Sequence, residues 1–126
     1  DFGIFQAVQL AAADLLQAEA CSELSVLEET SSIYEARRDV LVHGLMQAGW
    51  QVPNPKAGVF VWSRLPERLL SEGGEGFCRR LLEGYGVAAS PGTGFDFSSG
   101  DCVRFALVEN EARIRRAVKL ISTASE

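Results

Sequence analysis

The sequence is poor in the residues that bind metals and in the long apolar runs that cross membranes. It has one histidine, His43, and three cysteines that are scattered rather than paired as CxxC: Cys21, Cys78 and Cys102. Because a zinc site needs about four nitrogen or sulfur ligands at close spacing, we expect no metal site. No apolar run approaches the roughly 20 residues that span a bilayer, so we also expect no membrane segment.

Positive charge is scarce as well. The chain has 12 Lys and Arg against 17 Asp and Glu, which gives a formal net charge of -5. Nucleic acids and anionic membranes attract proteins through a basic field, so this composition argues against both partners. The unpaired cysteines fit free thiols in a reducing compartment, and we therefore predict a cytoplasmic protein.

What is present is an apolar content of 47% in 126 residues, enough for one domain with one core. Helical spacing and capping residues predict helices over 2–20, 26–48 and 75–84 and a last helix capped by Asn110. Strands are predicted over 58–62, 87–90 and 103–108, and a surface loop over 71–76. This order predicts an α+β domain in which helices cover a small sheet.

The two main strands have different patterns. Residues 58–62, GVFVW, are apolar at successive positions. We therefore expect both faces of this strand to be covered, with Phe60 and Trp62 in the core rather than stacked on a ligand. The alternative is that the end of this strand borders a cleft. Residues 103–108 alternate, so that Val103 and Phe105 point to one face and Arg104 to the other.

Most candidate sites have an ordinary structural explanation. The glycine-rich turn 91–94 lacks the full spacing of a phosphate-binding loop, so we predict a structural turn. The polar run 35–39 of the second helix, which includes Arg37 and Arg38, is predicted to face water. The same holds for the basic residues of the last helix, Arg113, Arg115, Arg116 and Lys119. A lone histidine is weak evidence for catalysis, so we predict that His43 is a structural or solvent-facing residue.

Arg104 is the exception, because it lies inside an apolar strand beside small residues. A guanidinium is a planar, permanently charged fork that suits a carboxylate. Burying such a charge without a partner is costly. From the residues alone, the partner is either a bound substrate or a carboxylate of the chain itself, and both alternatives stay open.

Three segments together resemble one family: YEARRDVLVHGLMQAGW (34–50), PKAGVFVWSRLPE (55–67) and, from residue 77, FCRRLLEGYGVAASPGTGF followed by GDCVRFALVENEARIRRAV. They are similar, in order and spacing, to the C-terminal small domain of the class I/II aminotransferases, which are pyridoxal-phosphate enzymes of fold type I. The similarity is densest to the branch of alanine and LL-diaminopimelate aminotransferases. Residues 1–13 resemble the segment that leads into that domain.

The resemblance implies a small, mostly antiparallel sheet covered by helices over residues 25–126, with 1–24 as a helical lead-in segment. It places Arg104 where the family binds the α-carboxylate of its substrate. The turn at 90–95 would border the substrate pocket, and Ala57 and Gly58 would form the opposite lip. Asp96 stands where relatives carry glycine, which adds a carboxylate beside this pocket.

The resemblance also implies what the chain lacks. The cofactor lysine and the other residues that hold pyridoxal 5'-phosphate lie upstream in the family, and neither Lys56 nor Lys119 has their sequence context. We therefore expect no catalytic and no cofactor-binding residue here, and an inactive isolated chain. Its start at Asp1 is typical of a cut through a longer enzyme, a homodimer acting on amino acids and 2-oxo acids. The alternative is a stand-alone, non-catalytic module of the same fold that binds small molecules or partners.

Overall fold

The computed structural model describes residues 3–21 and 26–126 of the chain. The fold divides into two compact units, residues 1–33 and residues 34–126. Helix α2 (Val26–Gln47) begins in the first unit and ends in the second. Each unit is described by itself.

The first unit contains helix α1 (Gln6–Ala20), none of whose residues is buried. The predicted apolar stripe of this helix is therefore exposed, and Phe2 lies outside the described residues. The large apolar side chains exposed in or next to this helix are Ile4, Phe5, Val8, Leu10, Leu15 and Leu16. Over the described ranges, no helix is both long enough and apolar enough to cross a bilayer.

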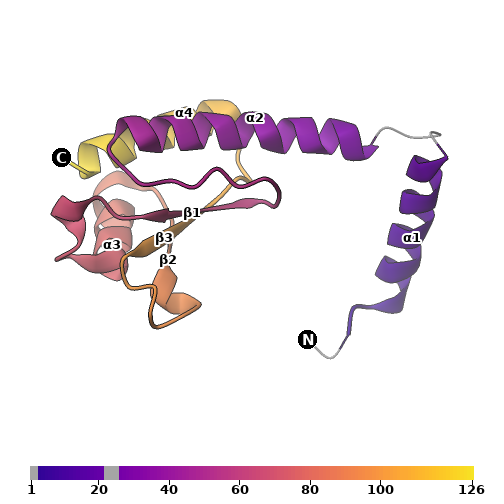
Figure 1. The fold of residues 1–126 in the computed structure, drawn as a ribbon, viewed down its shortest axis with the longest axis horizontal. Helices are drawn as coiled ribbons and strands as arrows, with labels where there is room; N and C mark the ends of the chain where they lie inside the picture. Colours follow the sequence, from indigo (N-terminus) through magenta and orange to yellow (C-terminus); the bar gives the residue numbers. More distant parts are fainter. Residues whose placement is uncertain (1–2, 22–25) are drawn as a thin grey trace. The chain divides into compact units, whose positions relative to one another are not determined.

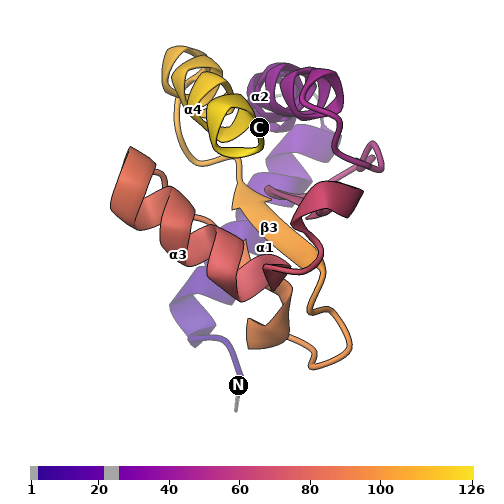
Figure 2. The same ribbon diagram turned by 90° about the vertical axis from the view of Figure 1, so that its left-hand side faces the viewer.

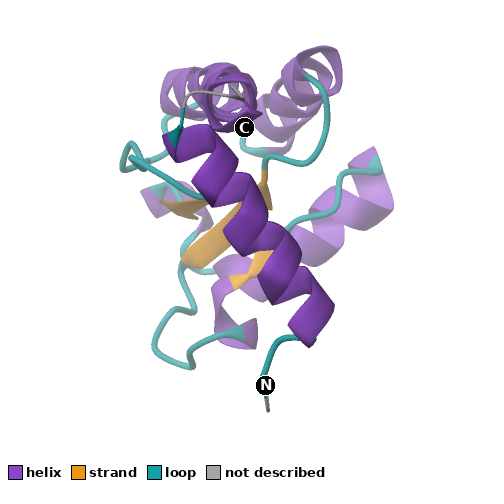
Figure 3. Ribbon diagram, turned by 90° about the vertical axis from the view of Figure 1, so that its right-hand side faces the viewer, coloured by secondary structure: helices purple, strands orange, loops and turns teal. Residues whose placement is uncertain are grey.

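The second unit is built on a three-stranded antiparallel sheet with strand order β1-β3-β2. Its strands are β1 (Phe60–Arg64), β2 (Ser90–Pro91) and β3 (Cys102–Ala106). Besides α2, its helices are α3 (Gly73–Tyr85), α4 (Glu111–Ala124) and the short 3-10 turns η1 (Glu67–Leu69) and η2 (Gly92–Gly94). The strands lie among longer helices (Figures 1 and 3), which confirms the predicted α+β fold with a small antiparallel sheet.

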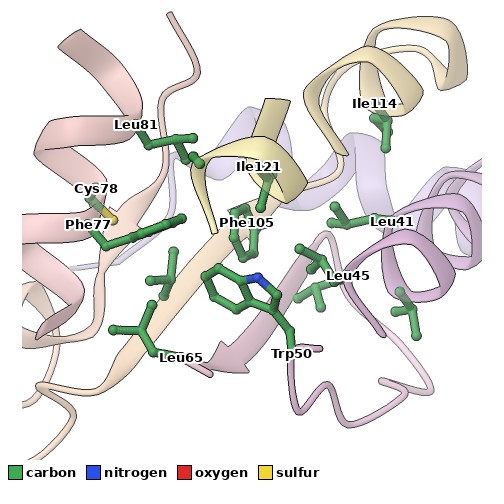
Figure 4. Close-up of a cluster of buried hydrophobic side chains, with 14 of the residues drawn as sticks. Leu41, Leu45, Trp50, Leu65, Phe77, Cys78, Leu81, Phe105, Ile114 and Ile121 are labelled. Carbon is green, nitrogen blue, oxygen red and sulfur yellow. The ribbon is translucent and has the colours of Figure 1, made fainter. Parts of the chain in front are cut away.

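Helices α2, α3 and α4 pack against one face of this sheet (Figure 2), and the core lies between them. Trp50 occupies the middle of the core (Figure 4), with its ring centroid 5.1 Å from that of Phe77 and 5.6 Å from that of Phe105. The indole Nε1 of Trp50 donates to Ser125 Oγ at 3.1 Å. This one residue therefore joins α3, β3 and the end of α4.

The predicted helix ends are confirmed where the sequence carried a specific signal. The side chain of Asn110 accepts a hydrogen bond from the backbone N–H of Arg113 at 3.0 Å and caps α4. Gly86 ends α3 in the left-handed conformation, with φ at +66°. Gly49, directly after the helix predicted over 26–48, has φ at +82°, the left-handed conformation that ends helices.

Two local expectations were wrong. Only one face of β1 is covered: Val61 and Ser63 are buried, whereas Phe60 and Trp62 are 39% and 37% exposed on the other face. The loop predicted at 71–76 belongs largely to α3, which begins at Gly73. A Cβ atom at Gly74 would lie 2.5 Å from the carbonyl oxygen of Cys102. This glycine therefore lets α3 pack closely on β3, and it does not mark a surface loop.

The run 35–39 of α2 is less exposed than predicted. Arg37 and Arg38 are half-buried. Arg37 Nη1 donates to the carbonyl oxygen of Leu107 at 3.0 Å, and Arg38 pairs with Glu35 and Asp39. The long stems of these arginines cover apolar surface while their charged ends reach acceptors.

Helices α2 and α4 meet at Gly44, and this contact yields a stability prediction. A Cβ atom there would lie 2.2 Å from Val118 Cγ1 and 3.2 Å from Val118 Cβ, so a change of rotamer alone does not relieve the clash. We expect Gly44→Ala to lower the free energy of unfolding by about 1 to 3 kcal/mol. The matched control is Gly84→Ala in α3, where nothing lies within 4 Å of the new atom.

Gly84→Ala should raise the free energy of unfolding by about 0.5 to 1 kcal/mol, because alanine favours helix more than glycine does. Denaturant unfolding of both variants is the measurement. Equal effects of the two substitutions would contradict the close α2–α4 contact.

Candidate functional site

The candidate site lies on the face of the sheet opposite the core. Arg104, on the central strand β3, pairs in register with Trp62 of β1 on one side and with Ser90 of β2 on the other. Phe60 lies on the same face of β1, two residues before Trp62. Strand alternation thus places one cation (Arg104), two aromatic rings (Phe60 and Trp62) and one hydroxyl (Ser90) on the same face of the sheet.

The guanidinium of Arg104 is held by aromatic rings rather than by a carboxylate. Its central carbon lies 4.1 Å from the centroid of the Phe60 ring and 4.0 Å from that of the Phe95 ring. Its one hydrogen-bond partner in the described part of the chain is Ser90, whose Oγ lies 3.5 Å from Nη2, at the long limit for such a bond. Among residues 3–21 and 26–126, Arg104 forms no ion pair.

The two acidic side chains of the loop before β3 have other partners. Asp96 accepts hydrogen bonds from the backbone N–H and the hydroxyl of Ser98, which hold the pKa of its carboxyl below the usual value. Asp101 pairs with Arg64, and this ion pair lowers the pKa of Asp101. Asp96, expected beside the pocket, is thus engaged within its own exposed loop.

The turn at 91–94 positions Phe95. The backbone N–H of Phe95 donates to the carbonyl oxygen of Gly92 at 2.9 Å. Gly92 is buried, and a Cβ atom there would lie 2.2 Å from the carbonyl oxygen of Ser99, so only glycine fits. The Phe95 ring also meets the ring of Trp62 edge-on, with centroids 5.4 Å apart. The close packing of Gly92 and the contact with Trp62 thus hold the Phe95 ring against Arg104.

The sequence places Phe60 and Trp62 in the core and Phe95 in the turn that borders the pocket, without predicting a contact between Phe95 and Arg104. The apolar run GVFVW carries no sign of which face is exposed, and the polar Ser63, which is buried on the same face as Val61, favours the wrong one. Ala57 and Gly58, expected as a lip of the pocket, are exposed residues before β1. Phe97, two residues after Phe95, is 95% exposed.

The other candidate residues lie away from this face. His43 on α2 lines an open groove with Lys119 of α4. Burial raises the pKa of the Cys78 thiol to about 11, so it is protonated at neutral pH and is a poor nucleophile. In the described ranges, no group of three or more His, Cys, Asp and Glu residues could hold a metal ion.

Neither lysine of the chain has the surroundings that pyridoxal phosphate requires. An aldehyde cofactor of this kind needs a lysine in an enclosed pocket with an acidic partner for its ring nitrogen. Lys56 and Lys119 are both exposed, and neither forms an ion pair with a described residue. The arrangement around Arg104 is instead suited to binding a planar anion such as a carboxylate.

Comparison with known proteins finds similarity to aminotransferases along nearly the whole chain. The family model for aminotransferase class I and II matches residues 2–121. The glutamate-pyruvate aminotransferase AlaC of Escherichia coli is 41% identical over 119 residues, which are 94% of this chain and 28% of that protein. An LL-diaminopimelate aminotransferase of Halothermothrix orenii is 33% identical over 124 residues, 98% of this chain and 30% of that protein.

Solved structures agree with the fold. The aspartate aminotransferase of Thermus thermophilus, solved with maleate, superposes with a TM-score of 0.69 at 28% sequence identity. The match covers 79% of this chain and 25% of that one. The chain therefore spans less than a third of the length of the curated and solved relatives named here.

Proposed function

The chain belongs to the class I and II aminotransferases, and from this premise we propose that it is the C-terminal part of a pyridoxal-phosphate-dependent aminotransferase. In this proposal Arg104 binds the α-carboxylate of the substrate. Residues 1–24 form the lead-in segment and residues 25–126 the small domain. The complete enzyme transfers an amino group between an amino acid and a 2-oxo acid.

The observation that carries the proposal is the surroundings of Arg104. Its guanidinium stands on the central strand against two rings, and the described residues offer it no carboxylate. A cation that the fold brings to one place without an internal counter-ion is suited to an anion from outside. Its in-plane N–H groups match the two oxygens of a carboxylate.

Two relatives support the substrate class. The Thermus thermophilus enzyme was solved with maleate, which is a dicarboxylate. The Escherichia coli relative is a glutamate-pyruvate aminotransferase, and both of those compounds carry an α-carboxylate. Glutamate with pyruvate is therefore the pair to assay first. In this proposal the cofactor of the complete enzyme is held by residues outside this chain, which the exposure of both Lys56 and Lys119 supports.

Replacing Arg104 tests the assignment in the complete enzyme. Arg104→Ala should lose a charge-assisted pair of about 2 to 5 kcal/mol, which lowers kcat/KM on the order of 30- to 4,000-fold at 1.4 kcal/mol per decade. Arg104→Lys should restore part of the loss, because an ammonium keeps the charge but not the two-pronged geometry. Steady-state kinetics of both variants is the measurement.

Thermal melting of the same variants is the control. If the partner of Arg104 is a ligand, the Tm without substrate should change little. Near-normal kcat/KM together with a lower Tm would identify Arg104 as a structural residue instead.

The isolated chain should bind no pyridoxal phosphate covalently, because its two lysines are exposed and lack an acidic partner among the described residues. Mixing the chain with the cofactor, dialysing and recording the absorbance spectrum is the measurement. Borohydride reduction and peptide mapping then locate any adduct. A stoichiometric adduct at one lysine would overturn this part of the proposal.

The assembly part of the proposal is a homodimer, and the apolar surface of α1 supports it. Six large apolar side chains are exposed in or next to this helix, and soluble monomers rarely expose large apolar patches. We expect the isolated chain to associate with itself in light scattering over a wide concentration range. Replacing both Leu15 and Leu16 by Gln should reduce the association, whereas Leu82→Gln, an equally exposed leucine on α3, should not. A monomer at every concentration would contradict self-association.

A further inference from the structure

We propose that Phe60 and Phe95 are positioning residues that hold the plane of the Arg104 guanidinium for its carboxylate. This inference rests on the proposed function of Arg104 and adds two residues to it. Phe60 and Phe95 together form the aromatic pair.

The aromatic pair reaches Arg104 from two separate elements. Phe60 comes from β1, where it pairs with Ala106 and is thus a diagonal neighbour of Arg104 on the same face of the sheet. Phe95 comes from the end of the η2 turn. Both ring centroids lie about 4 Å from the guanidinium carbon, well inside the roughly 6 Å within which a cation and a ring attract each other.

We infer that both rings lie against the faces of the guanidinium and leave its binding edge free. All N–H groups of a guanidinium lie in its plane, so a ring stacked on a face of the group covers no donor. Rings on the faces restrict the rotamers of a long side chain and remove water beside the charge. A carboxylate then meets a fork that has already lost much of its freedom, which lowers the entropic cost of binding.

Core packing does not explain the aromatic pair. The core aromatic residues Phe77 and Phe105 are buried, whereas Phe60 is 39% and Phe95 is 53% exposed. Phe95 is further held by the edge of Trp62 and by the turn whose Gly92 admits no side chain. The fold thus fixes a half-exposed ring in one place, and that place is beside Arg104.

The test uses the complete enzyme with glutamate and pyruvate. Phe95→Leu and Phe60→Leu should each raise KM for glutamate on the order of 3- to 30-fold, which corresponds to about 0.7 to 2 kcal/mol at 1.4 kcal/mol per decade. Because the carboxylate is bound equally in the ground and transition states, kcat should change by less than about 2-fold. Phe97→Leu is the matched control, since this side chain is 95% exposed on the same loop. It should leave KM unchanged.

A double-mutant cycle separates positioning from a structural role. In an Arg104→Ala background, Phe95→Leu should have no further effect on kcat/KM, because its effect is exerted through the guanidinium. The Tm of Phe95→Leu should stay within a few degrees of the parent. Equal effects in both backgrounds, or a KM unchanged by both phenylalanine substitutions, would overturn the inference.

The same measurements keep the two proposals apart. If kcat/KM falls strongly in Arg104→Ala while KM is unchanged in Phe95→Leu and Phe60→Leu, the carboxylate site is supported and the role of the aromatic pair is refuted. Near-normal activity of Arg104→Ala would remove the site itself, and with it the basis of the inference.

Discussion

The alternation along β3 is the constraint on which the rest of the structure depends. Val103, Phe105 and Leu107 point into the core, and Phe105 contacts Trp50, which in turn contacts Phe77 and bonds to Ser125. Because the side-chain period of a strand is two, fixing these residues inward fixes Arg104 outward. A slip of one residue would bury the guanidinium and expose the core, so the register of the central strand is also the geometry of the site.

Charge explains why Arg104 differs from other arginines of the chain. Arg64, Arg79 and Arg80 pair with carboxylates, while Arg37 and Arg68 donate to backbone carbonyl oxygens. The chain carries more acidic than basic residues, so internal carboxylates are plentiful. The two carboxylates that flank the loop before β3 are nevertheless engaged by Ser98 and Arg64. Lys56, Arg116 and Lys119 also form no ion pair with a described residue, but all three are exposed, whereas Arg104 is half-buried against two rings. The proposed carboxylate site depends on this combination of partial burial and missing counter-ion.

Much of the fold could be predicted from the sequence because local signals carried it. Asn110, Gly86 and Gly49 mark helix ends through backbone chemistry that needs no tertiary context. The glycines at 73–76 misled the prediction, since Gly74 permits a close approach of α3 to the carbonyl oxygen of Cys102, which no local pattern reveals. Arg104 could be singled out by its place in an alternating strand. Its aromatic neighbours could not, because Phe95 reaches it from a turn and Phe60 from another strand.

The wrong expectation for β1 also has a physical meaning. An apolar residue at every position predicts a strand covered on both faces, yet in the second unit the helices cover only one. Local rules are broken most often where a protein serves a function rather than its own stability. Aromatic rings on the uncovered face cost some exposure of apolar surface, but they attract a guanidinium without neutralising it. A carboxylate in their place would pair with Arg104 and close the site. Rings hold the guanidinium in place and leave its charge unpaired, which is the combination that the proposed carboxylate site requires.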